Sequence, residues 1–264
     1  MILFEKVTKQ FPNGTIALQE VSFHIEPGEF AFIVGPSGAG KTTILRLLLR
    51  ELEPTSGDII IEGQNLMNIK KKHLAQHRRK IGAAFQDFKL IEDRTVRENV
   101  SLVSEMIVPK FEEVKEHVQD ILTTVGLGDR GDLFPSQLSG GELQRTAIAR
   151  ALATHPKILF ADEPTGNLDQ ATGWEIIKVL LEINKSGTTV MVATHNQEFV
   201  KALRKRVIEL EEGRIIQDSK PTKEEDQKQA QTEKKEKAIP TKEKKVKKDQ
   251  QKQESKKDNQ QPEK

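Results

Sequence analysis

A short stretch of the chain combines glycines, a lysine and threonines at the spacing of a phosphate-binding loop. It reads G-x-x-x-x-G-K-T and stands between an apolar segment, Phe30–Val34, and a segment of helical composition that begins at Thr42. Glycines let the backbone approach a ligand closely, and the amides at a helix N-terminus point toward an anion. The candidate phosphate-binding residues are Gly35, Pro36, Ser37, Gly38, Ala39, Gly40, Lys41, Thr42 and Thr43.

Two side chains of this loop have specific chemistry. Lys41 would supply a positive charge to the β- and γ-phosphates of a nucleotide, and the Thr42 hydroxyl is placed to bind Mg²⁺. A glycine-rich turn with a solvated lysine is the alternative interpretation. Since every fixed position of the motif is matched between a strand and a helix, the stretch predicts a site for a nucleoside triphosphate.

Two acids follow a second apolar segment. Residues 158–161 read I-L-F-A and continue into Asp162 and Glu163. A strand that ends at a phosphate site places the first acid to hold Mg²⁺, and the second can orient or deprotonate an attacking water. Two surface acids at a strand end are the alternative, but the phosphate loop favours the catalytic interpretation.

A third motif, Leu-Ser-Gly-Gly-Glu, opens a predicted helix at residues 138–142. The pattern Ser-x-x-Glu is a capping box and explains Ser139 and Glu142 structurally. It does not explain Gly140 and Gly141, each of which costs roughly 1 kcal/mol relative to alanine in a helix. Bare glycines at a helix N-terminus suit a close approach to phosphate. A second phosphate-binding element predicts a head-to-tail dimer, with ATP between the loop of one chain and this helix of the other.

The rest of the chain must supply the elements that position these residues. Alternating and continuous apolar segments predict strands over 3–7, 17–25, 30–34, 58–62, 81–85, 158–161 and 188–193, and a closing hairpin over 207–216. Helical periodicity predicts helices from residue 42, over 111–125, from Ser139 through residue 152, and over 171–181. The strands near the N-terminus predict an antiparallel layer, and the later apolar segments suit buried parallel strands.

Composition divides the chain at residue 220. Residues 220–264 contain fifteen lysines, ten acids and eight glutamines but only four apolar residues, so we expect a disordered charged tail. The tail has a net charge of +5, against +2 for the whole chain, which leaves −3 for the predicted nucleotide-binding domain, residues 1–219. The domain is therefore not a basic nucleic-acid-binding body. Because the chain has no cysteine, disulfides, thiolate catalysis and cysteine-based zinc sites are excluded.

The expected location is the cytoplasm. Glu5 and Lys6 interrupt any secretory signal, and no apolar run approaches the length of a membrane span. If the protein acts at a membrane, a partner must hold it there. The basic run over residues 70–80 is best explained as a solvated helix face, with a phosphate or lipid-headgroup contact as the alternative.

Together these motifs resemble the ATP-binding-cassette ATPases over residues 1–218. The resemblance implies an α/β fold, with a RecA-like P-loop NTPase core, an antiparallel β layer and a helical subdomain at about residues 88–156. It also implies a role for four further residues. Phe11 would stack on adenine, Gln86 would contact Mg²⁺ and the γ-phosphate, Asp169 would lie in a loop that crosses the dimer interface, and His195 would contact the γ-phosphate.

Several short segments resemble the FtsE family of cell-division ATPases within this superfamily. They are R-R-K-I-G at 78–82, F-Q-D at 85–87, D-R-T-V at 93–96 and N-V at 99–100. This resemblance implies ATP hydrolysis coupled to an integral-membrane, FtsX-like partner, and an output on cell-wall hydrolysis at the division site. The segment over 162–169 is shared with lipoprotein-release and macrolide-export ATPases, and the charged tail is not part of the usual pattern.

Three alternatives remain beside this interpretation. An ATPase of a lipoprotein-release or macrolide-export system would differ only in its partner. A soluble cassette acting on nucleic acid or ribosomes usually has a coiled coil, zinc cysteines or tandem cassettes, none of which the sequence shows. A non-hydrolysing scaffold would lack Glu163, Lys41 or His195, and all three are present.

The loop after Gln86 is a candidate coupling surface. Phe88, Leu90 and Ile91 are large apolar residues in a predicted loop. They could receive a short cytoplasmic helix of the membrane partner, because aromatic and aliphatic anchors commonly dominate interface energy. A small satellite core beneath the loop would explain them equally well.

Overall fold

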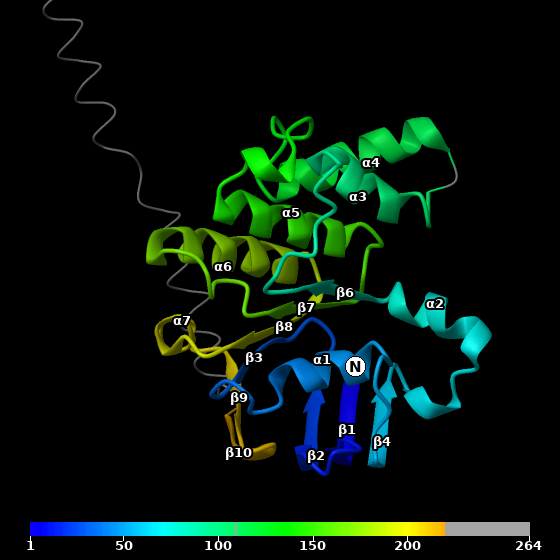
Figure 1. Cartoon of the computed structure of the whole chain (residues 1–264), viewed down its shortest axis with the longest axis vertical. Coiled ribbons are helices and arrows are strands. Elements are labelled where there is room, and N and C mark those ends of the chain that lie inside the picture. The colour runs from blue at the N-terminus through cyan, green and yellow to red at the C-terminus, as the bar shows by residue number, and fades with distance from the viewer. Residues whose placement is uncertain (109, 220–264) are drawn as a thin grey trace, which may run out of the picture. The chain divides into compact units, whose positions relative to one another are not determined.

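Two β-sheets frame the phosphate loop in the computed structural model, which describes residues 1–108 and 110–219 (Figure 1). The larger sheet has six strands in the order β10-β9-β3-β8-β7-β6, and all neighbours are parallel except β10 and β9. Its strands are β3 (Phe30–Val34), β6 (Ile81–Ala84), β7 (Ile158–Asp162), β8 (Thr189–Thr194), β9 (Arg206–Glu211) and β10 (Arg214–Ser219).

The smaller sheet is the predicted antiparallel layer. Its strand order is β2-β1-β4-β5, and every pair is antiparallel. The strands are β1 (Ile2–Gln10), β2 (Ile16–Ile25), β4 (Ser56–Ile61) and β5 (Gln64–Asn65). The sequence predicted the first three, somewhat shorter than they are, and missed the two-residue β5.

The hydrophobic core has two parts, one on each face of the six-stranded sheet. On one face, helix α1 (Lys41–Leu48) lies between the two sheets, and its buried residues pack with those of the antiparallel layer (Figure 1). Successive side chains of β3 point to opposite faces of the sheet and so contribute to both parts of the core. Ile33 belongs to this cluster, whereas Phe30 and Phe32 belong to the other. A strand buried on both faces explains why the sequence is apolar throughout this segment.

Helices cover the other face of the sheet (Figure 1). The elements are α3 (Val96–Ser104), α4 (Phe111–Thr124), α5 (Gly140–Leu152), α6 (Gln170–Lys185) and α7 (Gln197–Leu203), all of which contribute buried residues to this part of the core. Helix α2 (Leu74–Arg78) lies elsewhere, and 3₁₀ turns are formed by Leu66–Asn68, Lys71–His73 and Pro135–Gln137. Helices α3 to α5 fall in the predicted helical region. The stripe from Val114 to Val125 on α4 is buried in the same cluster as sheet residues such as Val190. This apolar side of α4 is therefore part of the core.

Two predictions about helices were incomplete. Helix α6 continues to Lys185 rather than ending at residue 181, and α7 was not predicted.

Within the basic run over residues 70–80, Lys70, Lys71 and Lys72 are exposed as expected. His77 is buried, and its Nε2 lies 2.7 Å from the Leu48 carbonyl oxygen. Arg78 donates to the Leu49 carbonyl at 3.0 Å. These contacts satisfy carbonyls that the C-terminus of α1 leaves open.

Within residues 1–108 and 110–219, no helix combines the length and the apolar content that a membrane crossing requires. The predicted charged tail, residues 220–264, lies outside the described residues.

Candidate active site

The phosphate loop joins β3 to α1, as the sequence predicted. Gly40 is the N-cap of α1 with φ of 109°, and a Cβ at this position would lie 2.6 Å from the Ala17 carbonyl oxygen. The loop therefore needs a residue without a side chain here, both for its backbone conformation and for its close approach to β2. This packing fixes the direction of α1, whose N-terminus faces the site.

Lys41 lies folded against its own loop. Its side chain is 7% exposed, and its Nζ donates to the carbonyls of Gly35 at 2.8 Å and Pro36 at 3.1 Å. The same nitrogen lies 3.3 Å from Oε1 of Glu163. The ammonium group is thus held at the mouth of the loop by neutral oxygens and by one carboxylate.

Asp162 and Thr42 form a set of oxygen ligands. The Thr42 hydroxyl donates to Oδ2 of Asp162 at 2.7 Å, whereas Oδ1 of Asp162 is buried and has no hydrogen-bond partner. Burial raises the pKa of Asp162, and the hydrogen bond from Thr42 opposes that shift. Gln86 lines the same cavity. Carboxylate, hydroxyl and amide oxygens suit Mg²⁺. A cation bound here would also give the buried Oδ1 of Asp162 a partner.

Glu163 lies between Lys41 and His195. Its Oε2 is 3.0 Å from Nδ1 of His195, and its side chain is 11% exposed. The Glu163 backbone has φ of 48°, a left-handed conformation that is uncommon outside glycine and is found at functional sites. Its amide donates to the Ala193 carbonyl at 2.8 Å, which ties this conformation to the end of β8. The orientation of Glu163 therefore depends on a contact with β8, a strand that is distant in the sequence.

One cavity of about 250 Å³ brings most of the predicted chemistry together. The residues that line it come from the phosphate loop, from the end of β7 and from the loops after β6 and β8. They are Ser37, Gly38, Gly40, Lys41, Thr42, Thr43, Gln86, Asp162, Glu163 and His195.

The remaining predicted residues do not line this cavity. Phe11 lies between β1 and β2, half-buried, with Nζ of Lys9 5.6 Å from its ring centroid. Ser139 caps α5, and its hydroxyl accepts from the Glu142 amide while the Glu142 carboxylate accepts from the Ser139 amide, which confirms the capping box. Asp169 caps α6 by accepting from the Thr172 amide at 3.0 Å. This cap was not predicted, although an Asp directly before a helical segment is a usable signal for an N-cap.

Gly141 has a structural role that the sequence did not indicate. A Cβ at Gly141 would lie 2.4 Å from Cγ2 of Thr172, so the first turn of α5 needs a glycine to pack against the first turn of α6. At Gly140 the nearest atom is Cδ2 of Leu168, at 3.0 Å. The expectation that the capping box leaves both glycines without a structural reason was therefore wrong for Gly141. At Gly140 that neighbour is the end of a flexible leucine side chain, so a Cβ there meets a contact that can move more easily than the one at Gly141.

The loop after Gln86 is tightly bound to the helical region. Phe88 is half-buried, whereas Ile91 is 42% exposed. Asn99 is fully buried and its Nδ2 donates to the Ile91 carbonyl at 3.0 Å, while its Oδ1 accepts from the Ile91 amide at 2.9 Å. Arg150 at the end of α5 donates to the Phe88 carbonyl at 2.8 Å.

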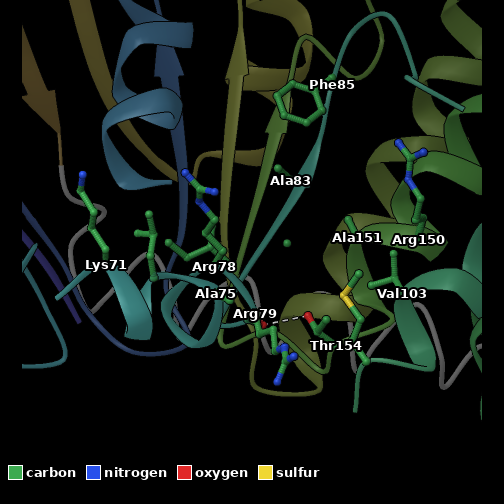
Figure 2. A pocket seen from close by; sticks show the side chains of 14 residues that line it. Lys71, Ala75, Arg78, Arg79, Ala83, Phe85, Val103, Arg150, Ala151 and Thr154 are labelled. Carbon is green, nitrogen blue, oxygen red and sulfur yellow. Dashed lines mark hydrogen bonds between the residues drawn. The ribbon is translucent and has the colours of Figure 1, made fainter. Parts of the chain in front are cut away.

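A second cavity, of about 590 Å³, lies along β6 and is named here the β6 groove. Figure 2 shows Lys71, Ala75 and Arg78 on one side of it and Val103, Arg150 and Ala151 on the other. The complete lining is Lys71, Leu74, Ala75, Arg78, Arg79, Ile81, Gly82, Ala83, Phe85, Val103, Met106, Arg150, Ala151 and Thr154. Because Phe85 directly precedes Gln86, the groove adjoins the loop that reaches the phosphate cavity.

Comparisons with known proteins agree with this geometry. The model of the ABC transporter family matches residues 18–166. The chain is 49% identical to the cell division ATP-binding protein FtsE of Streptococcus pneumoniae, over 83% of this chain and 95% of that protein. It is 42% identical to the FtsE of Escherichia coli K12, over 81% and 97% respectively. Among solved structures, it is similar to a dimeric ATP-binding cassette in a post-hydrolysis state bound to ADP and Pi, with a TM-score of 0.76, 37% identity, and coverage of 83% and 98%.

Proposed function

The chain belongs to the ABC transporter family and is an ATPase of that family, and we propose that it couples ATP hydrolysis to a membrane partner in bacterial cell division. The observation that carries the proposal is the convergence of Lys41, Asp162, Glu163 and His195 on one cavity. The FtsE relatives support the cell-division role.

Hydrolysis in this cavity would be an in-line attack of water on the γ-phosphate. The loop amides and Lys41 would hold the phosphates, and Glu163 would orient the water and accept its proton. His195, which lies 3.0 Å from Glu163, would keep that carboxylate in place and reach toward the γ-phosphate. Positioning and charge stabilisation would supply most of the rate enhancement.

Mg²⁺ would be held by Thr42, Asp162 and Gln86. The buried, unpartnered Oδ1 of Asp162 supports this assignment. When bound, Mg²⁺ neutralises charge on the β- and γ-phosphates. Thr42 and Asp162 already lie within hydrogen-bond distance of each other, so they can act as ligands with little rearrangement.

A homodimer would complete two nucleotide sites. The dimeric cassettes among the structural neighbours support this arrangement. In it, the capped N-terminus of α5, with Ser139, Gly140 and Gly141, would meet the nucleotide of the other chain, and Phe11 would stack on adenine. Because the Asp169 carboxylate already accepts from Thr172, this residue would act at the interface by shaping the loop over 167–169.

The partner would be an integral-membrane, FtsX-like protein, which would place the chain peripherally on the cytoplasmic face of the cell membrane. The loop after Gln86, together with the β6 groove, would receive a short cytoplasmic helix of this partner. Since Gln86 lines the phosphate cavity and Phe85 lines the groove, a helix seated here would sense the nucleotide cycle. We also propose that residues 1–219 are the nucleotide-binding domain, with the helical subdomain at about 88–156.

Glu163→Gln tests the proposed mechanism. This variant should bind ATP, lose at least about a hundredfold in turnover, as general-base removal typically does, and form an ATP-dependent dimer in sedimentation velocity. The matched control is Glu175→Gln, because Glu175 is an exposed acid that pairs with Arg145 away from the cavity. Parental turnover in Glu163→Gln would refute the assigned base, and a variant that stays monomeric with ATP would refute the dimer.

A further inference from the structure

The basic run over residues 70–80 presents two faces of different chemistry. Its apolar members, Leu74 and Ala75, line the β6 groove. Other members of the run line a separate cavity of about 370 Å³, named here the α2 cavity, whose lining is largely polar. His73, His77 and Lys80 are separated by four and three residues, so they lie on one side of the helical turns. The solvated face expected from the sequence is therefore hollowed into a cavity.

The side chains of the α2 cavity that can carry a charge are all basic. They are Lys70, Lys72, His73, His77 and Lys80, and no aspartate or glutamate is among the described residues that line the cavity. Like charges gathered in one small space repel one another, and an anion between them removes that repulsion. The cavity therefore favours an occupant with negative charge.

The carboxylate that reaches this region is already shared between two lysines. Glu62 pairs with Lys80 at 2.8 Å and also with Lys157. It does not line the α2 cavity. Over residues 1–108 and 110–219, Lys70 and Lys72 have no ion pair. At least two lysines of the cavity are thus left without a negative partner from the described part of the chain.

His77 gives the cavity a buried polar wall. The side chain is 5% exposed, and its Nε2 carries a proton because it donates to the Leu48 carbonyl. Its Nδ1 has no hydrogen-bond partner among the described residues, and it becomes a second donor when the ring is protonated. Burial lowers the pKa of His77, the hydrogen bond to Leu48 opposes this, and the charges of Lys80, Arg78 and Arg50 lower it further. The field at this buried ring is therefore positive.

Three neutral amides complete the polar lining. Gln64, Asn68 and Gln76 contribute side-chain amides, and within the described chain none of these three makes a side-chain hydrogen bond to another residue. Each amide offers two N–H donors beside the cations. A phosphate group has several acceptor oxygens as well as charge, so cations combined with amide donors suit it better than they suit a halide or a single carboxylate.

We propose that the α2 cavity binds a phosphate monoester, either free or at the headgroup of a lipid. Lys70 and Lys72 pair with its two negative charges, and the amides donate to its remaining oxygens. Basic pockets of this composition are known to recognise phosphorylated headgroups, and a free phosphorylated compound offers the same oxygens. The shared chemistry is a phosphate with about two negative charges near neutral pH.

This site is separate from the nucleotide site, because the α2 cavity and the phosphate cavity share no lining residue. The two sites lie at opposite ends of helix α1. Lys41 of the phosphate loop begins this helix, and Leu48, whose carbonyl accepts from His77, ends it. The inference does not depend on the proposed membrane partner.

A pair of neutralising substitutions with a matched control tests the inference. Lys70→Gln with Lys72→Gln, the cavity pair, removes two cations of the α2 cavity. Lys71→Gln with Arg79→Gln, the control pair, removes the same charge from the same segment, but these side chains line the β6 groove (Figure 2). All four side chains are exposed, so the fold should tolerate both pairs, and thermal unfolding verifies this. The fifteen lysines over residues 220–264 are common to all the chains compared.

Glycerol 3-phosphate is the probe for a free phosphate monoester. Its binding to the full-length chain is measured by isothermal titration calorimetry with Mg²⁺ and a non-hydrolysable ATP analogue at saturation, so that the phosphate cavity is already filled. We expect the cavity pair to lower the affinity about tenfold and the control pair to lower it less than about twofold, because only the first removes direct partners. Added salt should weaken binding to the parent chain.

Vesicle flotation distinguishes the two sources of the phosphate. Phosphatidylcholine vesicles contain either phosphatidic acid, a monoester, or phosphatidylglycerol, a diester, at equal total charge. A preference for phosphatidic acid that only the cavity pair loses assigns the site to a lipid headgroup. Selective loss of glycerol 3-phosphate binding without that preference assigns it to a free ligand. If neither probe distinguishes the cavity pair from the control pair, the inference is overturned.

Discussion

Arg150 holds the backbone of Phe88 in place, because its guanidinium donates to the Phe88 carbonyl oxygen at 2.8 Å. Phe88 and Lys89 have φ of 54° and 49°, both left-handed, and Arg150 donates to the carbonyls of both. Backbone in this region costs about 1–3 kcal/mol per residue unless its surroundings maintain it. The C-terminal end of α5 therefore stabilises the loop that follows Gln86, while the N-terminal end of the same helix carries Ser139.

Replacing Arg150 should disturb the loop more than the fold. We expect Arg150→Ala to lower the free energy of unfolding by about 1–3 kcal/mol, because two hydrogen bonds from a charged donor are lost. ATP turnover should fall about tenfold with a smaller change in nucleotide affinity, since Gln86 loses its support. Urea unfolding, a fluorescent nucleotide titration and a phosphate-release assay measure the three quantities. Arg94→Ala, which removes an exposed pair with Glu98, is the control, and equal effects of both variants would contradict the assigned role.

Asp162 predicts a pH dependence of stability. Burial raises the pKa of Asp162 above its ordinary value, so the folded chain binds the proton more tightly than the unfolded chain. The contribution of this group to the free energy of unfolding therefore falls as the pH rises from about 4, the ordinary aspartate pKa, to the raised pKa.

Asp162→Asn should remove this dependence. Measured without Mg²⁺ and nucleotide, the stability of the variant relative to the parent should increase with pH across that window and become constant above it. Urea unfolding from pH 4 to pH 8 measures this difference. A difference that decreases with pH would mean that the folded protein stabilises the carboxylate, contrary to the assigned shift.

Gly141 and Thr172 should behave as a coupled pair. Gly141→Ala places a Cβ against Cγ2 of Thr172, and we expect a loss of about 1–3 kcal/mol from overpacking. Thr172→Ser removes that methyl group but keeps the hydroxyl that donates to Asp169, so it should rescue Gly141→Ala. A double-mutant cycle measured by thermal unfolding quantifies the coupling. Gly140→Ala is the control, because its nearest neighbour is a flexible leucine methyl, and additive effects of Gly141→Ala and Thr172→Ser would contradict the contact.

Phe88→Ala distinguishes a coupling surface from a satellite core. If the loop after Gln86 receives a helix of the membrane partner, the variant should co-purify less of a co-expressed FtsX-like protein while nucleotide affinity stays at the parental value. Val114→Ala, a buried change on α4, is the control for a general loss of stability. Lower thermal stability of Phe88→Ala with undiminished partner binding would show that Phe88 is core.

Local signals in the sequence were sufficient for most elements. Strand β3 has the predicted bounds, because a continuous apolar run between turns is typical of a strand buried on both faces. The start of α5 at Ser139 was predictable because a capping box depends on residues three apart. Helix α7 was missed because seven residues give too little periodicity, although Asn196 caps it.

The arrangement of the site depends on contacts that no local pattern contains. The left-handed backbone of Glu163 and its contacts with Lys41 and His195 arise where the ends of β7, β8 and α1 meet. The contact of Gly141 with Thr172 likewise requires α5 and α6 to be packed together, which spacing along one helix cannot reveal. The sequence therefore predicted candidate residues for the site, and the structure shows which of them are in contact.

The strand order has a consequence for the synthesis of the chain. Strand β3, which ends in the phosphate loop, lies between β8 and β9, so Phe30 pairs with Val190 and Ala31 with Arg206. Such distant pairings slow folding, and they leave an apolar strand without neighbours while the intervening residues are being translated. A nascent chain that stops before β9 would contain the whole loop sequence but only one of the two strands that support it. The nucleotide loop is thus among the first parts of the chain to be made and among the last to take its shape.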